Sequence, residues 1–502
     1  MNELKFEKLY DLTIPTTETK SELYFQGNYQ NEEGKIFIDK GNSIDLGTYF
    51  NAFSVKRWIS YTTIRKLQIK LNLVGNFFVD LYGFDISGEE EILRLNCEGT
   101  IERTFDIRDF DDFDQLGIRL TALNDHCEFL GGEYFGAFES EREIKIGVTI
   151  CTFKREKYLL PNLDRLKTLT DRNKNFNVMV IDNGQTLDEK ISDELQIIHN
   201  RNFGGSGGFT RGIIEQVNQN KNTHIILMDD DIIIELSAFD RLYSILRHMK
   251  SDLVENFFAG AMLNVESPTI QVENTAYWNK IISKPFGEGF DLSNKHLICY
   301  NENVPDHSNN YSGWWFCCIP VDIVKKIGYP LPNFIKGDDI EYSLRNGKNI
   351  LTLNGVAVWH EAFAKKLNPV MKFFSDRGML LINHFAEGSG KFYFVVAVVL
   401  RILKRFIKFD LDSIRILEFA LEDLNGGFEK ITSIRADDKF SMLKSTPLNK
   451  NILSTIISIL KLTFKHFNDY EKLDRDYKKF RDEKLSDQKF WLEYLDIKHF
   501  ED

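Results

Sequence analysis

The sequence is poor in cysteine and proline, with 6 and 10 among 502 residues, and it lacks a membrane-spanning apolar run. No C-x-x-C pair occurs, so neither a disulfide scaffold nor a zinc site is expected. Residues 1–20 are polar and acidic and show no signal-peptide pattern. Phe392–Leu400 offers nine apolar residues before Arg401, whereas a span needs about 20. A reducing cytoplasm is therefore the expected compartment.

The charge balance is acidic, with a formal net charge of −12. This balance argues against attraction of the whole protein to nucleic acid, and no nucleic-acid partner is expected. Apolar residues make up 43% of the chain and aromatic residues 13%, which is a globular composition rich in aromatics. The length allows two or three domains, each able to bury a core.

Residues 1–140 are predicted to form a β-sandwich or jelly-roll domain. Short aromatic and β-branched runs alternate there with clusters of Gly, Asn and Asp, which is typical of many short strands. Gly131–Glu143 is predicted to be the link to the next domain. The runs interpreted as strands are Lys35–Asp39, Thr48–Phe53, Trp58–Ile64, Leu67–Leu73, Phe77–Tyr82 and Gly117–Ala122.

Residues 141–375 alternate strand-like and helix-like segments, which predicts a mostly parallel α/β sheet with right-handed crossovers. The expected strands are Ile144–Thr152, Asn177–Ile181, Gln196–Asn200 and Thr223–Met228. The expected helices are Tyr158–Leu169 and Phe209–Val217. Residues 376–502 are predicted to be helical, because Asp410–Leu424 and Tyr470–Lys484 have helical periodicity and dense charge.

One buried strand ends in three carboxylates, Asp229, Asp230 and Asp231. Ligands of open α/β sheets bind at the carboxyl ends of strands, and Mg²⁺ or Mn²⁺ takes oxygen ligands shared with substrate phosphates. The pattern predicts a metal-bridged phosphate or nucleotide-sugar site, although an acidic turn would also explain it. His360 closes the strand Val356–His360 and could complete the metal shell at the same sheet edge, or be a structural tip.

Four glycines in five positions, Gly204, Gly205, Gly207 and Gly208, precede a predicted helix. They would let the backbone approach a ligand and offer an anion the helix N-terminus, although a flexible loop would also explain them. The dinucleotide fingerprint is not matched, because its third glycine would fall on Thr210.

The segment Lys336–Gly347 begins a helix with Asp338 and Asp339 and ends it with glycine, as helix capping favours. Capping explains one aspartate, and core packing explains one of the adjacent Trp314 and Trp315. The four residues together fit a sugar ring stacked on an aromatic wall beside a general base.

In this order, the motifs resemble the GT-A glycosyltransferases of family 2. More narrowly, they resemble bacterial galactofuranosyltransferases of the mycobacterial galactan-polymerase type, and Thr48–Phe53 (TYFNAF) with Trp58 resembles the β-sandwich domain of that group. The likeness spans most of residues 20–380. It is carried by Thr152–Arg155, Asp182, the GGSGG segment, the Asp-Asp-Asp run, the Trp pair, Asp-Asp-x-Glu and His360.

The resemblance implies a role for each of these residues. It implies Asp339 as catalytic base, with Asp338 as its close rival. The implied metal ligands, for Mn²⁺ or Mg²⁺, are Asp229, Asp231 and His360. Arg155 and Asp182 would hold uridine diphosphate, with Asp182 at the base. The full implied set for donor and sugar is Arg155, Asp182, Gly204, Gly205, Gly207, Gly208, Asp230, Trp314 and Trp315.

The implied reaction is metal-dependent, inverting transfer of galactofuranose from a UDP-sugar to a glycan acceptor in cell-surface polysaccharide synthesis. The base would deprotonate the acceptor hydroxyl while the cation assists the leaving diphosphate. A related hexosyl- or rhamnosyltransferase with another donor is one alternative. A non-catalytic glycan-binding protein is another, and a homo-oligomer is compatible with all three.

Phe392–Phe409 interleaves Arg401, Lys404, Arg405 and Lys408 with apolar residues at helical spacing. This pattern favours an interfacial helix on anionic lipid, at the inner face of the plasma membrane, where a lipid-linked glycan acceptor would be met. A core helix with a basic edge would also explain it.

Overall fold

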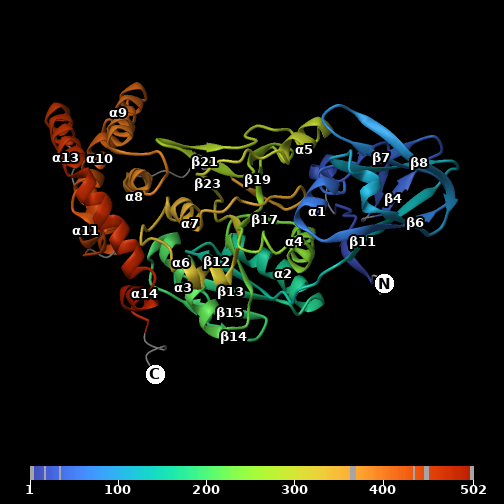
Figure 1. The fold of residues 1–502 in the computed structure, drawn as a ribbon, viewed down its shortest axis with the longest axis horizontal. Coiled ribbons are helices and arrows are strands. Elements are labelled where there is room, and N and C mark those ends of the chain that lie inside the picture. The colour runs from blue at the N-terminus through green and yellow to red at the C-terminus, as the bar shows by residue number, and fades with distance from the viewer. Residues whose placement is uncertain are drawn as a thin grey trace.

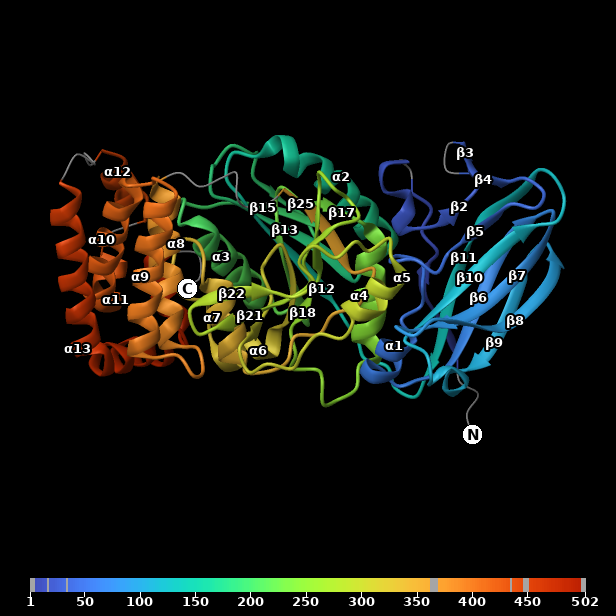
Figure 2. The ribbon, with the colours of Figure 1, turned by 90° about the horizontal axis from the view of Figure 1, so that it is seen from above.

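The computed structural model describes residues 5–15, 18–32, 35–361, 369–433, 436–445 and 451–497. Three parts follow one another along the longest axis of the molecule (Figure 1 and Figure 2). A β-rich N-terminal part forms one end, a mixed α/β part lies in the middle, and helices form the other end. The predicted fold class is confirmed, whereas the domain boundaries near 140 and 375 stay predictions.

The N-terminal part contains two antiparallel sheets, and most of their buried apolar side chains belong to one core cluster. The first sheet has the order β3-β4-β11-β6-β9, with β1 also paired to β11. Its strands are β1 (Phe6–Asp11), β3 (Gln30–Glu32), β4 (Lys35–Ile38), β6 (Ile64–Val74), β9 (Ile101–Asp106) and β11 (Cys127–Phe138). The second sheet contains β2 (Gln26–Gly27), β5 (Ser43–Asp45), β10 (Gln115–Ala122), β7 (Asn76–Phe84) and β8 (Glu89–Glu98).

Three local predictions in this part are wrong. Trp58–Ile64 is not a strand, because helix α1 (Val55–Tyr61) buries Val55, Trp58 and Tyr61, which share a face at helical spacing. Thr48–Phe53 lies mostly in turns. The predicted link from Gly131 is strand β11 as far as Phe138, where it pairs with β6 and β1. Short 3-10 helices at Glu18–Leu23 and Ile107–Phe110 complete this part.

The central sheet confirms the predicted, mostly parallel α/β arrangement. Its order is β14-β15-β13-β12-β16-β24-β18, in which β15, β13, β12 and β16 pair in parallel. Strand β12 is almost wholly buried, as its continuous apolar run predicts for a central parallel strand. The strands are β14 (Lys190–Ile191), β15 (Leu195–His199), β13 (Phe176–Asp182), β12 (Ile146–Thr152), β16 (His224–Asp229), β24 (Phe316–Pro320) and β18 (Phe258–Ala259).

Two smaller sheets lie beside the central sheet and form the upper layer of the middle part in Figure 1. One sheet has the order β17-β25-β19-β20, with β17 (Ile233–Ile234), β25 (Ala357–His360), β19 (Ala261–Asn264) and β20 (Gln271–Glu273). The other contains β22 (Ile282–Pro285), β21 (Ala276–Asn279) and β23 (Asn310–Tyr311). The helices of the middle part are α2 (Glu156–Arg172), α3 (Gly204–Gln219), α4 (Leu236–His248), α5 (Lys295–Asn301), α6 (Val321–Ile327) and α7 (Asp338–Asn346).

The glycine-rich segment is helical, so the prediction of a glycine loop before a helix is wrong. Helix α3 begins at Gly204 and contains all four glycines. A Cβ at Gly208 would lie 2.2 Å from Cys151 Sγ on β12, and one at Gly212 would lie 2.2 Å from Thr149 Cγ2. The glycines therefore let α3 pack closely on the central sheet, and this packing outweighs their low helix propensity.

The N-terminal sheets are joined to the middle part by buried polar contacts as well as by a shared apolar core. The guanidinium of Arg241 on α4 lies 3.7 Å from the ring centroid of Tyr10 and donates to the carbonyl of Phe50. Glu302 accepts hydrogen bonds from Ser54 (2.6 Å) and Gln115 (2.8 Å). These contacts fix the sheets against the middle part.

The C-terminal part is helical, as predicted. Its last helix returns to the middle part, where Trp491 Nε1 donates to the carbonyl of Pro330 at 3.2 Å. Within the described residues, no helix combines the length and the hydropathy that a membrane span requires. The helices are α8 (Pro369–Leu381), the 3-10 helix η4 (Ile382–His384), α9 (Lys391–Ile407), α10 (Asp412–Leu424), α11 (Gly427–Ser433), α12 (Ala436–Ser445), α13 (Ile452–Lys484) and α14 (Gln488–Leu495).

Candidate active site

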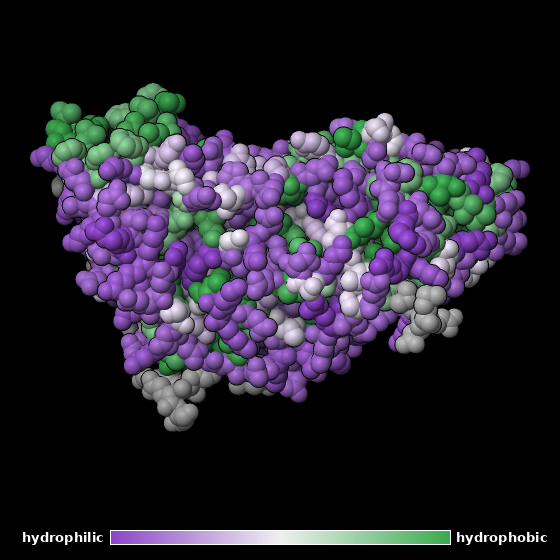
Figure 3. Space-filling view, in the orientation of Figure 1, coloured by the Kyte–Doolittle hydropathy of each residue, from purple (hydrophilic) through white to green (hydrophobic). Residues whose placement is uncertain are grey.

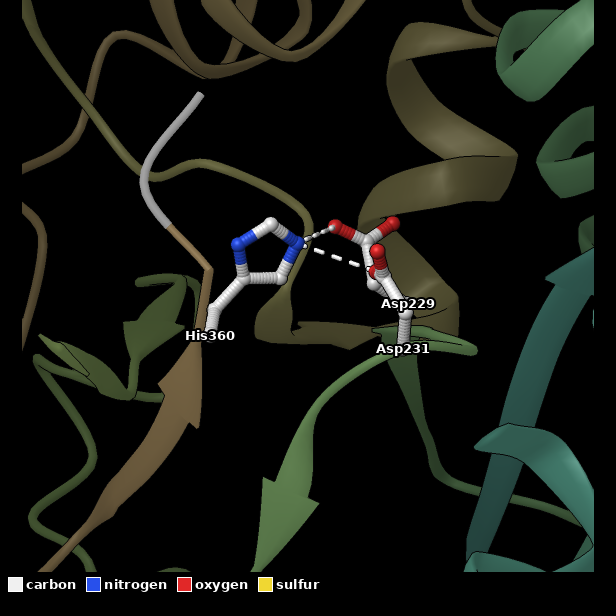
Figure 4. A group of neighbouring side chains, drawn as sticks. All are labelled: Asp229, Asp231 and His360. Atoms are coloured by element: carbon white, nitrogen blue, oxygen red, sulfur yellow. Dashed lines mark ion pairs between the residues drawn. The ribbon is translucent and has the colours of Figure 1, made fainter. Parts of the chain in front are cut away.

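Three predicted metal ligands meet at the end of β16. His360 Nε2 lies 3.0 Å from Asp231 Oδ1 and 3.9 Å from Asp229 Oδ2 (Figure 4). One ligand atom from each residue lies within 4.8 Å of the others. Two carboxylates and an imidazole that converge in this way could hold a divalent cation such as Mn²⁺ or Mg²⁺. We call Asp229, Asp231 and His360 the metal corner.

The position of His360 has a different cause from the predicted one. His360 closes β25, which belongs to the four-stranded sheet and not to the central sheet. The chain enters β17 just after Asp231, and β17 pairs antiparallel with β25, with Ile233 opposite Trp359. This pairing brings the imidazole beside the carboxylates. The expectation that His360 shares an edge of the same sheet is therefore wrong, although the three side chains do meet.

Hydrogen bonding and charge orient the imidazole toward the carboxylates. His360 Nδ1 contacts the backbone carbonyl of Glu361, so Nε2 points to Asp231. Burial lowers the pKa of His360, but the bond to Asp231 and the charge of Asp229 outweigh it and raise that pKa. Burial also raises the pKa of Asp229, against the attraction of His360.

Arg155 and Asp230 lie directly beside the metal corner. The guanidinium of Arg155 forms an ion pair with Asp231 and lies 3.5 Å from Asp230 Oδ1. Asp230 Oδ2 accepts a 2.7 Å hydrogen bond from Thr152 at the end of the neighbouring strand β12. Arg155 therefore lies where its charge can offset the charge of the carboxylates. Asp230 links the ends of β12 and β16 through its hydrogen bond with Thr152.

Asp182 ends β13 at the same edge of the central sheet, and it is fully buried. Its Oδ1 accepts from the backbone of Gly184 (2.8 Å), and its Oδ2 accepts from Thr186 (2.7 Å) and Leu187 (2.8 Å). These bonds hold the turn that follows the strand. The next residue, Asn183, donates to the carbonyl of Gly204 at the start of α3. Contact of Asp182 with a nucleobase stays a prediction.

Asp338 and Asp339 begin α7, and burial raises the pKa of both carboxyls. The charge of Asp339 raises the pKa of Asp338 further, whereas Lys336 lowers the pKa of Asp339. Asp339 Oδ1 accepts from the backbone N–H of Ile340 at 2.8 Å. The N-cap is Gly337, with φ +90°, and Asp338 is the first helical residue. A capping role for the Asp338 side chain is therefore wrong.

Glu273 is a buried carboxyl that the sequence patterns do not single out. It lies on β20, and burial together with the charge of Asp339 raises its pKa to about 8. Tyr311 is also influenced by Glu273 and Asp339, and its pKa is raised chiefly by burial. We call Asp338, Asp339 and Glu273 the base corner. Strand β20 pairs with β19 and β19 with β25, so one small sheet carries both Glu273 and His360.

Trp314 and Trp315 are both buried, at 5% and 6% exposure, and they precede β24 instead of lying on it. Trp314 packs against Phe209 (5.5 Å between centroids) and Tyr342 (6.1 Å). Trp315 Nε1 donates to the carbonyl of Gly260 at 2.8 Å. Because both residues precede β24, the alternation of side chains along a strand does not decide where they pack. Trp314 packs in one core cluster and Trp315 in another. Their role as a sugar-binding wall stays a prediction.

Two family models match this chain and indicate its class. Residues 144–373 match the family described as glycosyltransferase like family 2. Residues 16–127 match the domain described as galactofuranosyltransferase 2 N-terminal. The chain therefore carries a family 2 glycosyltransferase domain behind a galactofuranosyltransferase 2 N-terminal domain, and the resemblance inferred from the motifs is confirmed.

Two curated relatives carry the name galactofuranosyltransferase GlfT2. The protein from Mycolicibacterium smegmatis is 24% identical over 438 residues, which cover 79% of this chain and 66% of that protein. The Mycobacterium tuberculosis protein is 25% identical over 447 residues, which cover 79% and 67%. This chain thus matches about two thirds of the length of these relatives.

Among solved structures, a mannosyltransferase, PcManGT from Pyrobaculum calidifontis in complex with GDP-Man and Mn²⁺, superposes with a TM-score of 0.33 at 11% identity. The match covers 67% of this chain and 86% of that one.

Proposed function

We propose that this protein is a metal-dependent, inverting glycosyltransferase that moves galactofuranose from UDP-galactofuranose to a glycan acceptor in cell-surface polysaccharide synthesis. The observation that carries the proposal is the convergence of Asp229, Asp231 and His360 within 4.8 Å inside a family 2 glycosyltransferase domain. The galactofuranosyltransferase 2 N-terminal domain and the two relatives named galactofuranosyltransferase support the donor sugar.

The metal corner would hold the cation through a carboxylate oxygen from Asp229, another from Asp231, and His360 Nε2. A divalent cation in this position supplies Lewis-acid assistance to the departing diphosphate. Arg155, which already lies against Asp231, would offer its guanidinium to the phosphate oxygens. We assign Asp182 and the α3 glycines to binding the uridine part of the donor. Trp314 and Trp315 are assigned to the sugar.

The base corner would act on the acceptor. Asp339 removes the proton from the acceptor hydroxyl while the hydroxyl oxygen forms a bond to the anomeric carbon. The bond from that carbon to the diphosphate oxygen breaks, its electron pair leaves with UDP, and the anomeric configuration inverts. Burial raises the pKa of Asp339, which makes the carboxylate a stronger base than an exposed aspartate. Asp338 is the alternative base.

Release of UDP tests the proposal. Purified protein would be incubated with a panel of UDP-, GDP- and dTDP-sugars, each with Mn²⁺, with Mg²⁺ and with EDTA, in the presence of a galactofuranose-containing acceptor. We expect acceptor-dependent UDP release with UDP-galactofuranose and its loss in EDTA. Equal release with EDTA would exclude the metal mechanism, and release from a different donor alone would reassign the sugar.

Two further expectations extend this proposal. The acceptor is expected to be lipid-linked, and residues 392–409 are expected to bring the enzyme to the lipid. A cytoplasmic location, at the inner face of the plasma membrane, stays a prediction from the sequence.

A further inference from the structure

The largest exposed apolar area in the view of Figure 3 covers the upper ends of α9 and α13. On α9 the exposed side chains include Val396 (43%), Leu403 (51%) and Ile407 (78%). On α13 they include Leu453 (62%), Ile457 (46%) and Phe464 (67%). We call these six side chains the apolar ridge. Exposed apolar groups gathered in this way mark an interaction surface, whereas single ones need no explanation.

The ridge is the outer face of two helices whose inner faces are already packed. Phe394 of α9 stacks on His466 of α13 with 3.8 Å between ring centroids, and Phe392 meets Phe467 at 5.3 Å. Toward the core, α9 buries Phe394, Val398 and Ile402. On each helix successive ridge residues recur at intervals of four or seven positions, so each helix presents one apolar stripe. A core helix with a basic edge would not leave such a stripe outside.

The charges on the two helical segments that carry the ridge have one sign. Residues 391–409 contain five Lys or Arg and residues 452–468 contain two, and neither segment contains Asp or Glu, although the whole chain carries −12. The exposed cations there include Lys404 on α9, Lys408 directly after it, and Lys461 and Lys465 on α13. This concentration of positive charge beside an apolar stripe is unusual for so acidic a chain.

Two cations predicted to face lipid do not do so. Arg405 forms an ion pair with Asp376 of α8, and Arg401 Nε lies 3.4 Å from Asp376 Oδ1. Their side chains are only 11% and 17% exposed. Arg401 and Arg405 therefore attach α9 to α8. The exposed positive charge beside the ridge includes lysines of α13, a helix that the sequence pattern did not assign to this surface.

We propose that α9 and the first four turns of α13 form a two-helix surface that inserts the apolar ridge into the headgroup region of an anionic bilayer. Apolar side chains flanked by lysines are the chemistry that such a surface recognises. A symmetric contact with a second copy would bring the same lysines of both chains together without a carboxylate between them, which disfavours that occupant. The inference deepens the proposed function by naming the surface that would place the enzyme at a lipid-linked acceptor.

The test is flotation of the full chain with phosphatidylcholine vesicles that contain or lack phosphatidylglycerol, without donor or acceptor. We expect binding to the anionic vesicles that weakens as salt rises. A Lys461→Glu/Lys465→Glu variant should bind at least about tenfold more weakly, because each basic residue near an anionic surface contributes roughly fivefold. Ile457→Ser/Phe464→Ser should also bind more weakly. The matched control is Lys472→Glu/Lys479→Glu, which changes exposed lysines farther along the same helix and should bind as the unmodified chain does.

Several outcomes would overturn the proposal. These are equal binding to both vesicle types, no binding by the unmodified chain, or an equal loss in the control. Light scattering without lipid tests whether a second copy of the chain binds the ridge instead. If the unmodified chain is an oligomer and Ile457→Ser/Phe464→Ser is a monomer, the ridge is an interface between copies. Lys461→Gln/Lys465→Gln, a milder change, should give an intermediate loss in protein that melts like the unmodified chain. Binding needs no turnover, so Asp339→Asn should still bind vesicles, and failure of either proposal leaves the other testable.

Discussion

The two acidic corners of the candidate site are built from the same kind of side chain but differ in their surroundings. In the metal corner, Asp231 contacts both Arg155 and His360, and the attraction of His360 opposes the rise in the pKa of Asp229 that burial causes. In the base corner, Asp338 and Glu273 are buried and Asp339 is half-buried, and burial raises the pKa of all three carboxyls. Lys336 opposes this shift at each of them. The comparison teaches that nearby cations suit a carboxylate to bind a metal, whereas burial among carboxyls suits it to exchange a proton.

The largest effect is expected from the metal corner. Asp231→Asn removes one carboxylate from the proposed cation site and should lower turnover by at least about a thousandfold, since Lewis-acid assistance is worth several kcal/mol. Thermal melting separates loss of metal binding from loss of folding, because the Asp231 side chain is only 6% exposed and also pairs with Arg155 and His360. UDP release and thermal melting check this. Asp193→Asn, an exposed aspartate of the same domain, is the control. Normal turnover by Asp231→Asn would remove this residue from the metal site.

The next effect separates the two neighbouring aspartates. Asp339→Asn keeps the size of the side chain but removes the proton acceptor, so turnover should fall by about 10²–10⁴-fold. Asp338→Asn should stay within about tenfold of the unmodified enzyme. Initial rates at saturating donor and metal measure both variants. A loss confined to Asp338→Asn would reverse the assignment, and normal rates for both would exclude these residues as the base.

The base corner should also give the protein a pH-dependent stability. The pKa of Glu273 in the folded protein is about 8, above the usual value of 4.5, so the folded state binds more protons than the unfolded state between these values. The free energy of unfolding should therefore fall, by a few kcal/mol at most, as pH rises from about 5 to about 8. Glu273→Gln should make that fall smaller. Urea unfolding at several pH values checks this, and parallel pH profiles for the two proteins would contradict it.

The smallest effect is expected for the stability of Asp338→Asn. Since Gly337 is the N-cap, the substitution removes no side-chain N-cap, and because the pKa of Asp338 is raised to about 8 it replaces a carboxyl that is largely protonated at pH 7. We expect a change in unfolding free energy within about 1 kcal/mol. Urea unfolding at pH 7 measures it. A loss well above this value would mean that the buried carboxyl holds the base corner together.

The metal corner was predictable from the sequence because its parts carry local signals. Asp229 and Asp231 end an apolar strand, and His360 ends another. The reason given for their meeting was wrong, because the two-residue strand β17 that joins Asp231 to β25 is too short to leave a periodic pattern. The four parallel strands of the central sheet were predictable because they are short apolar runs, whereas β14, β24 and β18 of the same sheet were not predicted.

Other features depend on packing between distant segments and could not be read locally. Glu273 sits in a three-residue strand, and only the pairing of β20 with β19 brings it to Asp339. The glycines of α3 were predicted to form a loop, because the sequence does not show that the helix packs closely against Thr149 and Cys151. The sequence pattern predicts Arg401 and Arg405 as exposed cations, because their pairing with Asp376 on α8 depends on how the helices pack.

The central claim is that the metal corner binds the donor diphosphate while the base corner acts only on the acceptor. Calorimetric titration of UDP in the presence of Mn²⁺, into the unmodified chain, Asp231→Asn and Asp339→Asn, tests it most directly. We predict that Asp339→Asn binds UDP as tightly as the unmodified chain, and that Asp231→Asn loses the Mn²⁺-dependent part of the binding. Mn²⁺-dependent UDP binding that survives in Asp231→Asn, or is lost in Asp339→Asn, would contradict the account.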